Sequence, residues 1–155
     1  MSNVKDYRWA QAYLGGVRSL RHHLRYLDGK IMNLRDEIMT RGGVDQDVRV
    51  QTSKKKDALE NMVIRYIDEL ARLQEGYQQK YIELCKRQDE AMDRIACLKD
   101  GRCKELLIRY YIEWEDFVSI AADFGYIEPG SIYGLHRRAL QYFAEVANAN
   151  GWGDS

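Results

Sequence analysis

The sequence predicts an all-α protein in which a long antiparallel coiled-coil helical hairpin is followed by a C-terminal helix-turn-helix module. One proline in 155 residues favours long helices. Apolar residues recur at alternating spacings of three and four along two long stretches, and residues 116–140 have the pattern of a helix, a tight turn and a second helix. We therefore expect residues 1–99 to form the hairpin, residues 100–147 the module, and residues 148–155 a flexible tail.

The first long helix is expected to begin near Ala10 and to end near Arg41, where Gly42 and Gly43 terminate it. Its apolar positions follow a heptad pattern, which is typical of a coiled-coil seam. These positions are Ala10, Tyr13, Val17, Leu20, Leu24, Leu27, Ile31, Leu34 and Ile38. A short polar and basic connection then favours folding back onto a second helix.

The second long helix is expected over residues 57–98, with a heptad pattern from Leu59 to Leu98. Because this helix is longer than the first, its last apolar residues need cover from the C-terminal module or from a second subunit. Those residues are Ala91, Ile95 and Leu98. Together with Tyr77 and Tyr81, they motivate the prediction of a homodimer. The pattern leaves open whether the heptads pair within one chain or between two chains.

The module begins with a third helix over residues 103–113, which carries Tyr110 and Tyr111 on its apolar face. Asp116 is expected to cap a fourth helix, since a carboxylate at this position accepts hydrogen bonds from the first free amides. Gly125 is expected to end that helix in the left-handed conformation. A fifth helix is expected over residues 131–143 and would be the recognition helix.

The fifth helix has two distinct faces. The inner face carries Ile132, Leu135, Ala139, Leu140 and Phe143, and His136 is expected to be packed and hydrogen-bonded at the edge of this face. The predicted DNA-binding residues are Ser131, Tyr133, Arg137, Arg138 and Gln141. We expect the residues in the first turns to reach bases or sugars, and the two arginines to reach phosphate or guanine.

The distribution of charged residues favours DNA binding in one part of the chain and disfavours it in another. The chain has a formal net charge of zero, and residues 101–147 hold five basic and seven acidic groups, a net charge of −2. Because phosphate neutralisation dominates DNA affinity, this module alone should bind weakly. Basic residues elsewhere are candidates for additional contacts to the DNA backbone: Arg18, Arg21, Arg25, Lys54, Lys55 and Lys56. The alternative is a solvated face that pairs with carboxylates of the second helix.

Three segments of the module resemble a known family. They are residues 106–111, residues 119–126 and residues 132–140, and residues 49–53 upstream are similar too. This chain resembles the sigma factor region 4-like small helical proteins of Gram-positive phages and mobile elements, among them regulators of phage late transcription. The resemblance implies an all-helical protein with a C-terminal helix-turn-helix. The chain departs from the family pattern at Gly134, where a long and often basic side chain is usual.

Two functions follow from these observations. The first is a phage- or mobile-element-encoded transcription regulator that binds double-stranded DNA, with RNA polymerase as a further candidate partner. The alternative is a non-catalytic protein-interaction module that binds RNA polymerase or inhibits a host factor. We expect no enzymatic activity, no cofactor and no metal site, because the chain lacks phosphate-loop, nucleophile-elbow and zinc-ligand motifs. The three cysteines are expected to be reduced in a cytoplasmic protein, and no apolar run is long enough for a membrane span.

Overall fold

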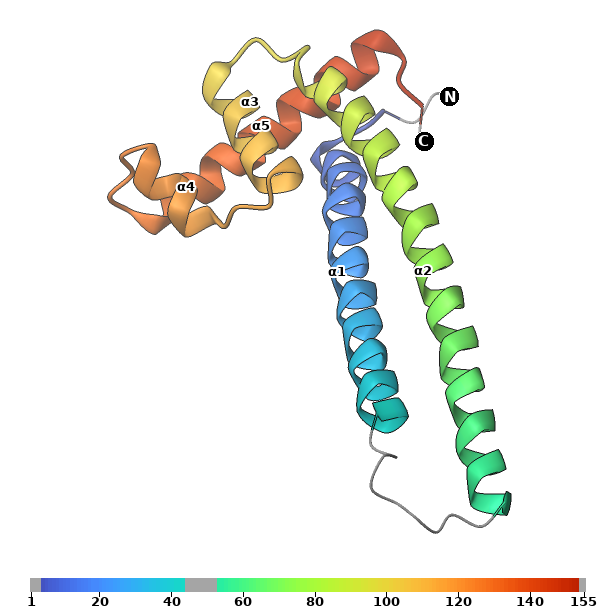
Figure 1. The fold of residues 1–155 in the computed structure, drawn as a ribbon. Coiled ribbons are helices and arrows are strands. Elements are labelled where there is room, and N and C mark those ends of the chain that lie inside the picture. Colours follow the sequence, from blue (N-terminus) through green and yellow to red (C-terminus); the bar gives the residue numbers. More distant parts are fainter. Residues whose placement is uncertain (1–3, 44–52, 154–155) are drawn as a thin grey trace. The chain divides into compact units, whose positions relative to one another are not determined.

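The computed structural model describes residues 4–43 and 53–153, and within these ranges the regular elements are all helices without any strand, which confirms the all-α class. Figure 1 shows the helices α1 (Tyr7–Gly43), α2 (Ser53–Ile95), α3 (Gly101–Leu107), α4 (Phe117–Asp123) and α5 (Pro129–Asn150), with a π-helical turn η2 (Ile108–Ile112) between α3 and α4. Residues 49–52, which contribute to the family resemblance, lie outside the described residues, and only the backbone of Lys54 is described.

The chain forms two compact units. Unit 1 comprises Met1–Arg21 and Leu84–Ser155, and unit 2 comprises His22–Glu83. The long helices α1 and α2 each contribute to both units, so this division does not follow the boundary expected at residue 99. The first turns of α1 and the last turns of α2 belong to the same compact unit as α3, α4 and α5.

Unit 1 contains a completely buried core to which every one of its helices contributes. Its largest fully buried side chains are Phe143, Leu14, Ile95, Leu106, Leu107, Ile120, Leu140 and Cys103. α2 ends at Ile95, three residues before the expected end at residue 98. Ala91 and Ile95 in its last turns and Leu98 just after it are at most 2% exposed, so the chain itself buries these apolar side chains and no second subunit is needed to cover them. Leu14 lies outside the predicted heptad stripe, and its burial shows that α1 has a wider apolar arc where several helices surround it.

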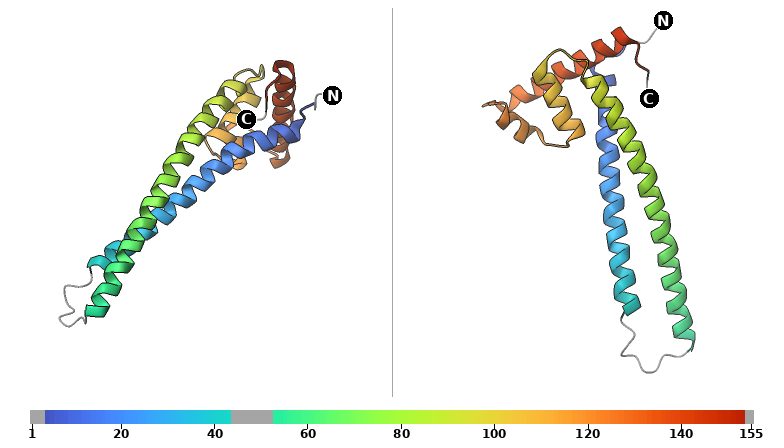
Figure 2. Two further views of the ribbon diagram at one scale, coloured as in Figure 1. Left: turned by 90° about the vertical axis from the view of Figure 1, so that its right-hand side faces the viewer. Right: turned by 45° about the horizontal axis from the view of Figure 1, so that its top comes forward.

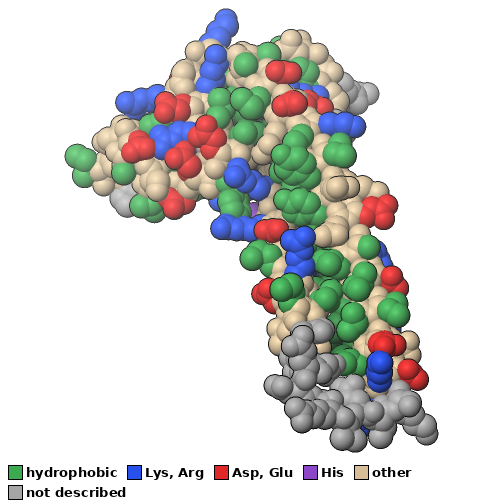
Figure 3. All heavy atoms as spheres, in the orientation of Figure 1, with side chains coloured by type: hydrophobic (Ala, Val, Ile, Leu, Met, Phe, Trp, Pro, Cys, Tyr) green, Lys and Arg blue, Asp and Glu red, His purple; other side chains and the backbone are tan. Residues whose placement is uncertain are grey.

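Unit 2 consists of two helix segments, one from α1 and one from α2, which run side by side in opposite directions (Figures 1 and 2). Of its described residues, Leu24 and Ile31 alone are buried hydrophobic residues, whereas Leu70 is half-buried. Several large apolar side chains are exposed: Tyr26, Met32, Met39, Ile64, Ile67, Tyr81 and Ile82. Figure 3 shows hydrophobic side chains along both segments on the face in view.

The predicted third helix is interrupted. α3 begins after Asp100, whose side chain accepts a hydrogen bond from the amide of Cys103 at 3.0 Å, and it ends at Leu107. The helix then continues as the π-helical turn η2, at whose end the amide of Glu113 donates to the carbonyl of Ile108 at 2.9 Å. Trp114 follows with φ of 67°, a left-handed conformation that is strained for a bulky residue. The expectation of one regular helix to residue 113 was therefore wrong.

The pair α4 and α5 follows the sequence more closely. Asp116 caps α4 by accepting a hydrogen bond from the amide of Ser119 at 2.7 Å, and Gly125 has φ of 75°, so both predictions are confirmed. Pro129 lies in the first turn of α5, where its missing N–H costs no hydrogen bond. α5 continues to Asn150, beyond the expected end, and Trp152 contacts Phe143 with ring centroids 5.5 Å apart. Residues 148–152 thus make helical and ring contacts where a flexible tail was expected over residues 148–155, and residues 154–155 lie outside the described residues.

Candidate functional site

The outer face of α5 is the candidate site. The five predicted DNA-binding residues are all exposed: Ser131, Tyr133, Arg137, Arg138 and Gln141. The opposite face is buried, with Ile132, Leu135, Ala139, Leu140 and Phe143 each at most 5% exposed. The core therefore fixes the rotation of α5 about its axis and directs the polar residues to solvent. Gly134 lies on the same outer face, and an added Cβ there would meet no atom within 4 Å.

An aromatic cluster holds the first half of α5. Tyr133 meets the ring of Phe117 at 5.5 Å, and Phe117 stacks on Tyr110 of η2 at 4.0 Å. Nε2 of His136 lies 2.7 Å from the hydroxyl of Tyr111, which confirms that this histidine is packed and hydrogen-bonded. Burial lowers the pKa of His136 to about 4, because the cluster disfavours the charged imidazolium. The ring is therefore neutral at pH 7 and has a structural role.

Arg137 also contacts the beginning of α1. Its guanidinium lies 4.7 Å from the centroid of the Tyr7 ring, and Nε of Arg8 lies 3.5 Å from the Tyr7 hydroxyl. The pKa of Tyr7 is lowered, first by its hydrogen bond and charge interaction with Arg8 and then by the charge of Arg137. Sequence reasoning missed Tyr7 and Arg8, since no local pattern indicates that the first turn of α1 lies beside α5.

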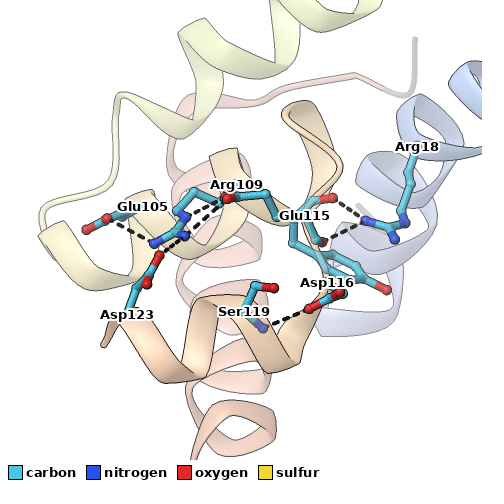
Figure 4. Close-up of polar contacts among 8 residues, drawn as sticks. Arg18, Glu105, Arg109, Glu115, Asp116, Ser119 and Asp123 are labelled. Carbon is cyan, nitrogen blue, oxygen red and sulfur yellow. Dashed lines mark hydrogen bonds and ion pairs between the residues drawn. The ribbon is translucent and has the colours of Figure 1, made fainter. Parts of the chain in front are cut away.

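Arg18 and Arg21, two of the predicted contacts to the DNA backbone, form hydrogen bonds within unit 1. Arg18 donates hydrogen bonds to the carbonyls of Tyr110 and Glu115, and its guanidinium lies 4.0 Å from the centroid of the Tyr110 ring (Figure 4). Arg21 donates to the carbonyl of Ile112 at 2.8 Å. These bonds satisfy carbonyls in and just after the π-helical turn, where the regular helical pattern ends. Both arginines therefore stabilise the connection to Trp114.

The remaining predicted backbone contacts lie in unit 2. Arg25, Lys55 and Lys56 are exposed there, whereas the exposure of the Lys54 side chain is not described. The structure thus divides the expected basic stripe between the two units. Exposure is compatible with a solvated face as well as with contacts to phosphate.

Arg109 organises an acidic cluster on unit 1. Its guanidinium hydrogen-bonds Glu115 at 3.1 Å and Asp123, and it forms an ion pair with Glu105 at 3.6 Å (Figure 4). The side chain of Arg109 is 14% exposed, and its pKa is raised by the hydrogen bonds with Glu115 and Asp123. One cation is surrounded by three carboxylates, so this cluster connects α3 to α4 and leaves a net negative surface.

No family model, curated protein or solved structure gives a significant match to the chain. Over the described ranges, no group of histidine, cysteine and acidic side chains is arranged to hold a metal ion. The helices described here also include none with the length and apolar character required to cross a membrane.

Proposed function

We propose that this chain is a DNA-binding transcription regulator of the phage or mobile-element type, in which α4 and α5 act as a helix-turn-helix. The single observation that supports it best is the polarity of α5. Its outer face exposes Tyr133, Arg137 and Gln141 in line, while its inner face is fixed in the core. A recognition helix needs this combination, because base contacts require a fixed rotation of the helix in the major groove.

The side chains on this face match the chemistry of duplex DNA. Arg137 and Arg138 are able to form bidentate hydrogen bonds with phosphate or with the O6 and N7 atoms of guanine. Gln141 is able to pair with adenine in the same groove. Ser131 and Tyr133 lie in the first turns of α5, and both are exposed.

A titration with duplex DNA tests this function. Fluorescence anisotropy would be measured with random and genomic duplexes at about 50 and 200 mM salt, since phosphate contacts make affinity depend steeply on salt. Sequence-preferring binding that falls in the double variant Arg137→Ala with Arg138→Ala supports the proposal. The matched control is Arg65→Ala with Arg72→Ala, which removes two exposed arginines from α2 in unit 2. Absence of wild-type binding at the lower salt concentration contradicts the proposal.

Unit 2 supports a second candidate function, a non-catalytic protein-interaction module that binds RNA polymerase or a host factor. The observation that favours it is the exposure of Ile64, Ile67 and Ile82 along α2, each at least half exposed. Exposed apolar groups of this size are typical of surfaces that contact other proteins. This function gains support if the protein fails to bind DNA and a pull-down recovers RNA polymerase.

A homodimer remains a proposal that the same exposed side chains motivate. The last turns of α2 and the residues just after it no longer support it, because the chain itself buries Ala91, Ile95 and Leu98. Tyr81 is 52% exposed and lies near Ile82, so a second copy would bury both. Light scattering at several concentrations tests this proposal, and a monomer mass that does not change with concentration contradicts it.

A further inference from the structure

We propose that Arg8 and Arg137, which both contact Tyr7, form a phosphate-binding site for the DNA backbone at the flank of α5. This inference rests on the proposed DNA-binding function and adds the first turn of α1 to the interface. Arg137 was expected to contact DNA from the sequence of α5 alone, whereas Arg8 and Tyr7 come from the opposite end of the chain. In this site the two arginines would bind phosphate, and Tyr7 would be a positioning residue.

The start of α1 is anchored beside α5 by contacts that do not involve the proposed site. The amide of Lys5 donates to Oδ1 of Asn148 at 2.9 Å, and Nδ2 of Asn148 donates back to the carbonyl of Lys5 at 2.8 Å. Trp9 stacks on Phe143 of α5 with ring centroids 5.9 Å apart. Residues 5–9 are therefore attached to α5 both before and after Tyr7 and Arg8, so these two residues have a defined position.

Both arginine side chains of the site contact the Tyr7 side chain. The Arg137 guanidinium lies 4.7 Å from the centroid of the Tyr7 ring, and that of Arg8 lies 5.8 Å from the same centroid. Both arginines are exposed, while Tyr7 is half-buried. Contact with an aromatic ring uses the π-surface of a guanidinium and leaves in-plane N–H groups available for phosphate oxygens. Nε of Arg8 donates to the Tyr7 hydroxyl, and the two terminal nitrogens of that guanidinium remain for phosphate. One tyrosine that contacts both arginines therefore holds two sets of donors.

The charges around this site are suitable for an anion. Within residues 4–43 and 53–153, no ion pair involves Arg8 or Arg137. The carboxylate closest in sequence is Asp6, and it accepts hydrogen bonds from the amides of Arg8 and Trp9 at 3.0 and 3.1 Å. Asp6 therefore caps α1. Its charge contributes to the raised pKa of Arg8, after the hydrogen bond and charge interaction with Tyr7, but it forms no ion pair with that guanidinium among the described residues. Arg109 differs, because three carboxylates surround it.

This site also adds positive charge beside a module whose own net charge disfavours binding to DNA. Residues 101–147 carry a net charge of −2, which limits the affinity of this segment for phosphate. Arg8 and Lys5 belong to the N-terminal segment and add positive charge beside α5 that a count over the module does not include. A duplex seated on α5 would then meet phosphate contacts from two helices.

The test uses the full-length chain and a duplex DNA to which the wild type binds. Anisotropy titrations at several salt concentrations would compare wild type, Arg8→Ala, Tyr7→Ala and Tyr7→Phe, with Arg72→Ala as the control for loss of one exposed arginine. If Arg8 contacts one phosphate, Arg8→Ala lowers the magnitude of the salt slope by about 0.9, and Arg72→Ala leaves the slope unchanged. Tyr7→Phe retains the ring under Arg137 and should bind DNA more tightly than Tyr7→Ala.

A double-mutant cycle separates positioning from a general structural role. If Tyr7 acts by holding Arg137, then Tyr7→Ala weakens binding in the wild type and has little further effect in the Arg137→Ala background. Circular dichroism of each variant would verify that the helices are retained. Wild-type binding that neither Arg8→Ala nor Tyr7→Ala alters overturns the phosphate site and leaves the proposed function intact. Loss of all wild-type binding at low salt overturns the proposed function itself.

Discussion

Unit 1 and unit 2 are built from the same two long helices, yet they differ in how completely they bury apolar side chains. In unit 1, Leu14 and Phe143 are 0% exposed because several helices surround them. In unit 2, two helix segments shield one another along a single seam, and Leu70 on that seam is half-buried. The comparison shows that a heptad pattern predicts which face is apolar, whereas the number of neighbouring helices determines how far that face is buried.

The largest expected difference between the units is in the cost of the same truncation. We expect Leu14→Ala to reduce the free energy of unfolding by about 2–5 kcal/mol, because it removes a fully buried side chain and leaves a cavity. Leu70→Ala removes the same atoms from a half-buried position and should cost less than half as much. Urea denaturation of both variants measures the difference. Equal losses would show that unit 2 is packed as tightly as unit 1.

The connection around Trp114 gives the next prediction. Arg18→Ala should reduce the free energy of unfolding by about 1.5–3 kcal/mol, since it removes charged hydrogen bonds to the carbonyls of Tyr110 and Glu115. Arg72→Ala in unit 2 is the matched control, and it should change stability by less than about 0.5 kcal/mol. Thermal denaturation at neutral pH compares them. Similar stabilities of the two variants would contradict a stabilising role for Arg18 in the π-helical connection.

His136 makes the stability of unit 1 depend on pH. Because its pKa is about 4 in the folded chain and 6.5 in its ordinary state, the unfolded chain binds more protons between these values. The free energy of unfolding should therefore fall as the pH is lowered from 6.5 towards 4. His136→Gln should weaken this dependence, whereas His23→Gln, at an exposed position in unit 2, should retain it. Unfolding curves at several pH values check this, and an unchanged dependence in His136→Gln would contradict it.

Two helical glycines, one in each unit, give the prediction with the smallest expected change in stability. Gly134 in unit 1 and Gly29 in unit 2 both have open space where a Cβ would be added. Replacement of either by alanine should stabilise the protein by about 0.5–1 kcal/mol, because glycine is a poor helix former. Gly134→Arg should also raise affinity for duplex DNA, while Gly29→Arg should have little effect. A larger gain from Gly29→Arg would place the DNA contacts in unit 2.

Local patterns predicted much of the fold and part of the candidate site. The cap at Asp116 and the left-handed Gly125 depend on neighbours close in sequence, and both are confirmed. The two faces of α5 followed from helical periodicity. The same periodicity placed His136 at the edge of the inner face, where its packing is confirmed, although it did not identify Tyr111, 25 residues away, as the hydrogen-bond partner.

The features that the sequence did not reveal depend on contacts between distant segments. The π-helical turn and the strained Trp114 are stabilised by Arg18 and Arg21, which lie on another helix. The placement of Tyr7 against Arg137 likewise needs the start of α1 to lie along α5. The periodicity of a single helix carries no information about such pairs.

Hydrogen–deuterium exchange with and without a bound duplex tests most directly whether unit 1 binds DNA through α5 and the first turn of α1. If α5 and the first turn of α1 contact DNA, the duplex slows exchange of the amides in residues 131–141 and 5–9. Amides of the exposed apolar stretch of α2, from Ile64 to Ile82, should exchange at the same rate in both samples. Protection confined to unit 2, with α5 unchanged, would contradict DNA binding by unit 1.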